Sequence, residues 1–162
     1  MTDTLFELAT EVLSLARAEG LMIATAESCT GGLIAGALTE VPGSSDVVDR
    51  GFVTYSNAAK REMLGASPVT LAQFGAVSEE IAREMSEGAL RKSAAQIAVA
   101  VTGIAGPGGS EHKPEGRVCF GLAIEGRETL TETVEFGAIG RSQVRAATVS
   151  HALNLIRVAL NA

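Results

Sequence analysis

Apolar side chains near the start of the chain recur every three or four positions, which is the spacing of one face of an α-helix. The repeat spans residues 5–16. Thr4 and Glu7 have the spacing of a capping box at the start of this helix, and Gly20 provides a residue that ends it. The pattern therefore predicts an amphipathic helix that covers one face of a domain.

The remaining chain alternates between short apolar runs and longer helical patterns. Strands are predicted at residues 21–26, 49–55, 96–102, 117–124 and 128–136. Helices are predicted at residues 32–39, 56–63, 79–93 and 140–160. Gly65, Pro68 and Gly75 indicate a short connector, and residues 103–116, with five glycines and two prolines, indicate a long structured loop.

This order of elements predicts the fold class. Strands that are joined through helices pair in parallel, whereas the last two strands, joined at residues 125–127, form an antiparallel hairpin. We expect a single α/β domain over residues 1–162, with three α/β/α layers and a mixed, mainly parallel sheet. The composition agrees with a globular domain, since 46% of the residues are hydrophobic and 20% are charged.

Charge and cysteine content exclude several classes of function. Thirteen Lys and Arg against 19 Asp and Glu give a formal net charge of −6, so the positive excess of nucleic-acid-binding proteins is missing. Cys29 and Cys119 form no CxxC pair, and we expect neither a disulfide framework nor a metal or other cofactor. No signal peptide and no apolar run of ~20 residues is present. We expect a cytoplasmic protein without nucleic-acid or membrane partners, and the sequence is compatible with a homo-oligomer.

Unusual polar and glycine-rich segments follow three of the predicted strands. They are residues 27–32, residues 55–60 and residues 102–109. Functional sites in open α/β sheets collect beyond the carboxyl ends of the strands. We therefore expect the three segments to converge on one edge of the sheet.

Ser28 lies at a predicted strand-to-helix turn, where its hydroxyl is a candidate nucleophile. The backbone N–H groups of Cys29, Thr30, Gly31 and Gly32 could bind an oxyanion at the helix N-terminus. The alternative is a serine that only caps the helix. Cys29 is a rival nucleophile, since a helix N-terminus lowers the pKa of a thiol. Its position in the turn instead favours a side chain that points into the core, and we favour Ser28.

A hydroxyl nucleophile requires a base, and Lys60 is the best candidate. His112 and His151 do not stand at motif spacing. Lys60 could act as a base if burial or a neighbouring cation lowers its pKa; otherwise it is a solvated lysine on a helix surface. Tyr55 could relay a proton or orient Ser28 and Lys60, and it could equally be a core residue.

The loop at residues 103–109 resembles a phosphate cradle, although it matches neither the P-loop nor the GxGxxG pattern. Anion binding by its backbone N–H groups remains plausible. Arg141 and Arg145 stand near the start of the last helix, where the helix dipole disfavours cations. Either a bound anion such as a phosphate compensates this placement, or the two are ordinary surface arginines.

Several of these segments together resemble the C-terminal domain of the competence-damage protein CinA, over roughly residues 5–160. The segments that carry the resemblance are TAESCTGGLIAGALTEVPGSS, GFVTYSNAAK, VTGIAGPGG, GRVCFGLA and GRSQVR. Stand-alone versions of that domain are nicotinamide-nucleotide amidohydrolases. The family often has Gly-Asp-Arg where this chain has Ile139 and Gly140 before Arg141. The departure affects only the arginine positions.

The resemblance implies a metal-free hydrolysis of nicotinamide mononucleotide to nicotinate mononucleotide and ammonia. It implies that Ser28 is the catalytic serine, with Lys60 and Tyr55 as its partners. The substrate would bind at the remaining site positions, which include the turn after Ser28. These positions are Cys29, Thr30, Gly31, Gly32, Thr102, Gly103, Gly106, Arg141 and Arg145. Covalent attack by Ser28 and activation of a water molecule both remain open. So do two other classes of function, which are a catalytically silent nucleotide-binding module and an amidase or esterase for another small substrate.

Overall fold

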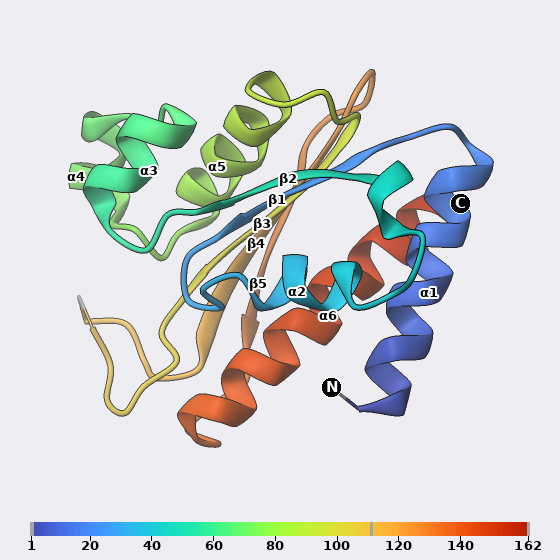
Figure 1. The fold of residues 1–162 in the computed structure, drawn as a ribbon. Coiled ribbons are helices and arrows are strands. Elements are labelled where there is room, and N and C mark those ends of the chain that lie inside the picture. Colours follow the sequence, from blue (N-terminus) through green and yellow to red (C-terminus); the bar gives the residue numbers. More distant parts are fainter. Residues whose placement is uncertain (1, 111, 162) are drawn as a thin grey trace.

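Five strands form one mixed sheet in the order β2-β1-β3-β4-β5 (Figure 1). The computed structural model describes residues 2–110 and 112–161, so Glu111 in the predicted 103–116 loop and both terminal residues lie outside the described part. The strands are β1 (Ile23–Glu27), β2 (Val48–Val53), β3 (Ile97–Gly103), β4 (Arg117–Ile124) and β5 (Leu130–Glu135). β1 pairs in parallel with β2 and β3, and β4 pairs antiparallel with β3 and β5. The predicted mixed sheet with a hairpin is confirmed, but two pairings are parallel and two are antiparallel, so the sheet is not mainly parallel.

Helices cover both faces of the sheet, which gives three layers (Figure 1). One face carries α1 (Asp3–Ala18), α2 (Leu33–Thr39) and α6 (Arg141–Asn161). The other carries α3 (Asn57–Leu64), α4 (Pro68–Phe74) and α5 (Glu79–Arg91). Alternate side chains of β3 explain this division, because Val99 belongs to the core under α1, α2 and α6, whereas Ala98 and Ala100 belong to the core under α3 and α5.

Small residues allow α5 to approach its neighbours closely. A Cβ atom on Gly88 of α5 would lie 1.9 Å from the carbonyl oxygen of Leu64, at the end of α3. A Cβ atom on Gly121 of β4 would lie 2.4 Å from the carbonyl oxygen of Ala82. Both separations are far below van der Waals contact, so glycine at position 88 lets α5 approach α3, and glycine at position 121 lets α5 approach the sheet. This packing also places α3, which carries Lys60, beside the end of β1.

The structure differs from the sequence-based prediction at the first helix. The α1 helix begins at Asp3, and the hydroxyl of Thr2 accepts a hydrogen bond from the Leu5 amide at 3.1 Å. The capping box predicted at Thr4 and Glu7 is therefore wrong, because the chain becomes helical two residues earlier. A short 3-10 helix (Ser44–Asp46) also precedes β2.

The predicted connector around Pro68 contains a helix, α4. Ser67 caps it by accepting hydrogen bonds from the Val69 and Thr70 amides, and Pro68 stands in its first turn. The carboxylate of Glu84 on α5 accepts hydrogen bonds from the Ser67 amide at 2.7 Å and the Thr70 hydroxyl at 2.6 Å. Serine followed by proline is a typical helix start, so this element was recognisable in the sequence.

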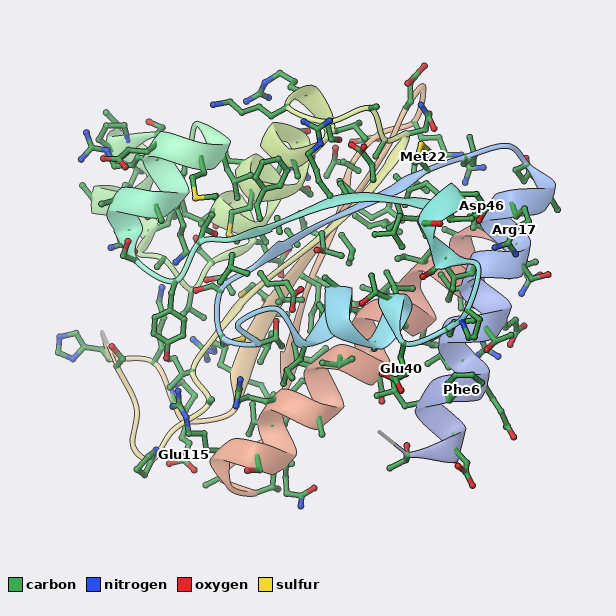
Figure 2. All side chains as sticks on the ribbon, viewed as in Figure 1. Phe6, Arg17, Met22, Glu40, Asp46 and Glu115 are labelled. Atoms are coloured by element: carbon green, nitrogen blue, oxygen red, sulfur yellow. The ribbon has the colours of Figure 1, made fainter. Side chains whose placement is uncertain are left out.

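The carboxyl ends of β1, β2 and β3 lie at one edge of the sheet because the three strands run in parallel. The segments after these strands therefore meet there, as the sequence predicts. At the opposite end of the molecule, Arg17 and Asp46 form an exposed ion pair, far from Glu115 in the loop after β3 (Figure 2). Among residues 2–110 and 112–161, no helix has the length and apolar character that crossing a bilayer requires.

Candidate active site

Ser28 and Lys60 are in direct contact at the sheet edge. Ser28 follows the last residue of β1, and Lys60 stands on the inner face of α3. The Lys60 Nζ atom lies 2.9 Å from the Ser28 Oγ atom, within hydrogen-bond distance. Lys60 is only 1% exposed and Ser28 8% exposed. Lys60 is therefore a buried residue and not a solvated lysine on the helix surface.

Backbone carbonyl groups at the end of β2 hold the Lys60 amine in place. Its Nζ atom donates to the carbonyl oxygen of Thr54 at 3.0 Å and to that of Tyr55 at 3.4 Å. Ser56 caps α3 by accepting a hydrogen bond from the Ala59 amide, which fixes the helix one turn before Lys60. The amine is therefore aimed at Ser28 by groups from both β2 and α3.

The segment between β1 and α2 is a tight turn, which we call the serine turn (residues 28–32). The Ser28 amide continues the sheet by donating to the Val101 carbonyl at 3.1 Å. The Gly31 amide donates back to the Ser28 carbonyl at 3.1 Å, and Gly31 and Gly32 have positive φ angles of 58° and 106°. Only glycine adopts such angles without strain.

Glu27, which the sequence analysis did not assign, occupies the N-terminus of α2. Its buried carboxylate accepts hydrogen bonds from the Thr30 hydroxyl at 2.5 Å, the Ile34 amide at 2.8 Å and the Ala35 amide at 3.0 Å. The Ile34 and Ala35 amides in the first turn of α2 are thus bound to this side chain and do not face a ligand. The oxyanion donors that the sequence analysis considered, at residues 29–32, precede them. An acidic residue just before a glycine-rich turn and a short helix is the signal that could have found it.

Cys29 is buried, and the burial raises the pKa of its thiol to about 11. The residue's own backbone N–H lowers this pKa, the nearby Glu27 carboxylate raises it, and Lys60 and Arg145 lower it. The expected lowering by the helix N-terminus is therefore outweighed, and at neutral pH the group is an unreactive thiol.

We expect Cys29→Ala to retain at least about a third of the wild-type activity. A thiol with a pKa of about 11 is almost fully protonated at pH 7, so its sulfur contributes little as a nucleophile. Mass spectrometry after iodoacetamide treatment at pH 7.5 should likewise find little alkylation of Cys29 in the folded protein. Rapid alkylation together with loss of activity would transfer the nucleophile from Ser28 to Cys29.

A cavity of about 350 Å³ opens beside Ser28. This size suits a small-molecule ligand. Its lining combines the sheet-edge segments with the start of α6 and consists of Ser28, Cys29, Tyr55, Asn57, Lys60, Ala76, Val77, Thr102, residues 103–110 and Arg141. The three strand-end segments thus build one cavity together with Ala76, Val77 and Arg141.

The loop after β3, which we call the glycine loop (residues 103–109), is held by fixed contacts. The Thr102 hydroxyl donates to the Ala76 carbonyl at 2.8 Å, and a Cβ atom on Gly103 would lie 2.6 Å from the Val118 side chain. Gly106 has a φ of 89°, and a Cβ atom there would lie 2.5 Å from the Glu115 side chain. The glycines therefore let the loop pack against its own returning segment.

Arg141 connects the two sides of the cavity mouth. Its guanidinium donates to the Gly106 carbonyl at 2.6 Å and to the Tyr55 hydroxyl at 2.9 Å. Tyr55 is 61% exposed, so it is not a core residue. Arg145 lies elsewhere: it donates to the carbonyls of Cys29 at 3.1 Å and Thr30 at 3.3 Å and does not line the cavity. The structure thus separates the two arginines, which the sequence analysis treated as a pair.

Metal ligands are not gathered at this site or elsewhere in residues 2–110 and 112–161, where no group of three or more His, Cys, Asp or Glu side chains could hold an ion. His151 instead contacts Glu132 and packs against Phe120, with a ring-centroid separation of 4.5 Å, under the β4–β5 hairpin. It lies among residues that the cavity does not include. The chemistry available at the site is that of a hydroxyl, an amine, a guanidinium and backbone groups.

Comparison with known proteins identifies similar sequences. A nicotinamide-nucleotide amidohydrolase PncC from Enterobacter agglomerans is 53% identical over 82% of this chain and 81% of its own length. One from Escherichia coli K12 is 46% identical over 96% of this chain and 95% of its own length. A CinA-like protein from Chlorobium phaeobacteroides is 60% identical over 76% of this chain, which spans only 30% of that relative.

A solved structure and a family model show the family to which this chain belongs. The crystal structure of the competence/damage inducible protein CihA from Agrobacterium tumefaciens superposes with a TM-score of 0.95 at 53% identity, over 100% of this chain and 98% of that chain. The model of the CinA C-terminal domain matches residues 5–160. This chain therefore belongs to the CinA C-terminal domain family.

Proposed function

We propose that this protein hydrolyses the carboxamide of nicotinamide mononucleotide, giving nicotinate mononucleotide and ammonia. The observation that carries the proposal is the buried contact of Lys60 Nζ with Ser28 Oγ at the wall of the cavity. The two relatives named as nicotinamide-nucleotide amidohydrolases support the substrate, since the chain spans 81% and 95% of their lengths. Amide hydrolysis needs an activated nucleophile, stabilisation of an oxyanion and a proton for the departing nitrogen.

In the proposed mechanism, Lys60 acts as the base and then as the acid. The uncharged amine takes the Ser28 hydroxyl proton while the Ser28 oxygen bonds to the carboxamide carbon. Collapse of the tetrahedral intermediate breaks the carbon–nitrogen bond, and the Lys60 ammonium returns the proton to the leaving ammonia. A water molecule then adds to the acyl carbon while Lys60 takes its proton. The Lys60 ammonium returns this proton to the Ser28 oxygen as the oxygen–carbon bond breaks, and the released acid loses a proton to water to become the carboxylate.

Burial of Lys60 favours this use of its amine. Removing an ammonium group from water disfavours its charged form, and the proposed base acts as the neutral amine. The partners at the end of β2 are carbonyl oxygens, which also orient the amine toward Ser28. Tyr55 has a different role in this proposal: its hydroxyl is bound by Arg141 at the exposed mouth, where it contacts and positions substrate.

We further propose that Arg141 and the backbone N–H groups of the glycine loop bind the substrate's 5′-phosphate. The mononucleotide should then be hydrolysed about 10- to 100-fold more efficiently than the phosphate-free riboside, since a charge-assisted hydrogen bond contributes ~1.5–3 kcal/mol. Arg141→Ala should remove most of this preference, chiefly through KM. Equal kcat/KM values for nicotinamide mononucleotide, its riboside and free nicotinamide in wild-type protein would contradict the phosphate site.

An ammonia-release assay tests the proposed function. The substrates are nicotinamide mononucleotide, the riboside, nicotinamide and simple aliphatic amides. Release from the mononucleotide alone, or far faster than from the others, supports the proposal. Faster turnover of another amide would assign a different substrate. Binding of the mononucleotide by calorimetry without ammonia release from any substrate would assign a catalytically silent nucleotide-binding module.

A further inference from the structure

The guanidinium of Arg145 binds the backbone of the serine turn and not the cavity. Arg145 stands on α6, and its Nε and Nη2 atoms donate to the carbonyls of Cys29 and Thr30 at 3.1 and 3.3 Å. A Cβ atom on Gly31 would lie 3.6 Å from the Arg145 Nη2 atom, so the side chain is in van der Waals contact with the turn. It thereby joins α6 to the segment that carries Ser28.

Hydrogen bonds within the turn fix the direction of the backbone amide that follows Ser28. The peptide bonds here are trans, so each carbonyl points opposite to the N–H group of the same peptide unit. Arg145 holds the Thr30 carbonyl, and the N–H of that unit, on Gly31, donates to the Ser28 carbonyl at 3.1 Å. The Ser28 carbonyl that accepts this bond belongs to the same peptide unit as the Cys29 N–H. The Cys29 N–H therefore points in the opposite direction, away from the interior of the turn.

The amides of Cys29 and Thr30 donate no hydrogen bond to another residue in the described part of the chain. Cys29 lines the cavity and directly follows Ser28. An N–H group next to the nucleophile can reach the oxygen that becomes negative when the nucleophile attacks. The Cys29 amide thus has the place of an oxyanion donor, and within the described residues its one interaction is with its own thiol.

Glu27 fixes the same turn from the opposite side. Its carboxylate binds the Thr30 hydroxyl and the Ile34 and Ala35 amides, and it is only 1% exposed. Gly32, the N-cap residue of α2, has no side chain that could do this. One anion and one cation therefore hold the serine turn between β1, α2 and α6.

We propose that Arg145 and Glu27 are positioning residues that hold the serine turn so that the Cys29 backbone N–H stabilises the oxyanion formed on the carboxamide. The proposal rests on the amide hydrolysis proposed above and assigns Arg145 no contact with the phosphate. Displacement of an oxyanion donor lowers kcat by roughly 10²-fold or more in other hydrolases. We therefore expect Arg145→Ala to lower kcat by ~10²-fold with little change in KM.

The kinetic test compares Arg145→Ala with Arg141→Ala on nicotinamide mononucleotide and its riboside. A positioning residue acts on the bond that breaks, so Arg145→Ala should lower kcat equally for both substrates, and added guanidinium ion should restore part of the activity. Arg157→Ala, at a half-buried position on the same helix that contacts Asn154 and Glu11 instead of the serine turn, is the matched control and should leave kcat unchanged. An Arg145→Ala defect confined to KM for the phosphorylated substrate would make Arg145 a phosphate ligand and overturn the proposal.

The Glu27→Gln variant tests the other side of the turn. The amide side chain can keep one acceptor but turns an NH₂ group toward an N–H group of α2, so we expect a lower melting temperature together with a lower kcat. Glu40→Gln, at the exposed C-cap of α2, is its control. A Glu27→Gln protein with wild-type kcat would remove Glu27 from the proposal.

Amide NMR tests whether Arg145 orders the serine turn, and it requires no substrate turnover. In ¹⁵N-labelled protein, Arg145→Ala should shift the Cys29 and Thr30 amide resonances and speed hydrogen exchange of the Gly31 amide, while Arg157→Ala should not. If the wild-type protein releases no ammonia, the proposed function fails and this measurement still decides whether Arg145 orders the turn. Unchanged resonances and exchange in Arg145→Ala would overturn the positioning role.

Discussion

Ser28→Ala is expected to lower ammonia release from nicotinamide mononucleotide by at least ~10³-fold, since removing a catalytic serine leaves only the contribution of binding and of the oxyanion site. The fold should remain intact. The Ser28 side chain contacts Lys60, whereas the structural contact of this residue is its amide bond to the Val101 carbonyl, which alanine keeps. Steady-state kinetics beside a thermal melt measures both properties.

Cys29→Ala is the matched control, because it removes the neighbouring polar atom from the same turn and the same cavity wall. Rapid-quench mass spectrometry adds a direct observation: wild-type protein should carry a nicotinyl nucleotide adduct on Ser28, and Ser28→Ala should carry none. Near-normal turnover by folded Ser28→Ala protein would exclude Ser28 as the nucleophile. Loss of turnover in Ser28→Ala without any adduct on the wild-type protein would indicate that Ser28 orients a water molecule.

The convergence of the three strand-end segments could be predicted from the sequence because it depends on strand direction. Apolar runs joined by helices pair in parallel, and parallel strands end at the same edge. Ser28 and Lys60 are 32 residues apart, yet Ser28 directly follows β1 and Lys60 stands in the first turn of α3, the helix after β2. Their contact could therefore be predicted from the order and direction of the strands.

The functions of Glu27 and Arg145 could not be predicted in the same way. Glu27 binds amides seven and eight residues further along the chain, which requires the exact path of the serine turn. Arg145 reaches carbonyls more than 100 residues before it, and this contact depends on how α6 packs against α2. Burial of Cys29, which reverses the expected direction of its pKa shift, likewise depends on packing between layers. Local spacing carries no information about such contacts.

Lys60→Arg is expected to lower kcat about as much as Lys60→Ala, by ~10²-fold or more, because a guanidinium keeps the charge but cannot give up a proton near neutrality. A residue that only contributes positive charge would tolerate the arginine. Lys60→Met, which keeps the length of the side chain without a titratable group, controls for the packing of this 1% exposed position. Thermal melts of all three variants separate loss of the fold from loss of the base.

The pH dependence of kcat/KM tests the same role. A base must be deprotonated to act, so wild-type activity should rise with pH through the titration of the Lys60 amine. Free lysine titrates near ~10.4, so a rise in the neutral range that belongs to this amine would identify it as the base. The rising limb should disappear in Lys60→Arg and Lys60→Met, while Arg157→Ala should keep it. If Lys60→Arg retains most of the activity and the same rising limb, Lys60 binds or orients substrate only, and Tyr55 or a water molecule beside Thr102 becomes the candidate base.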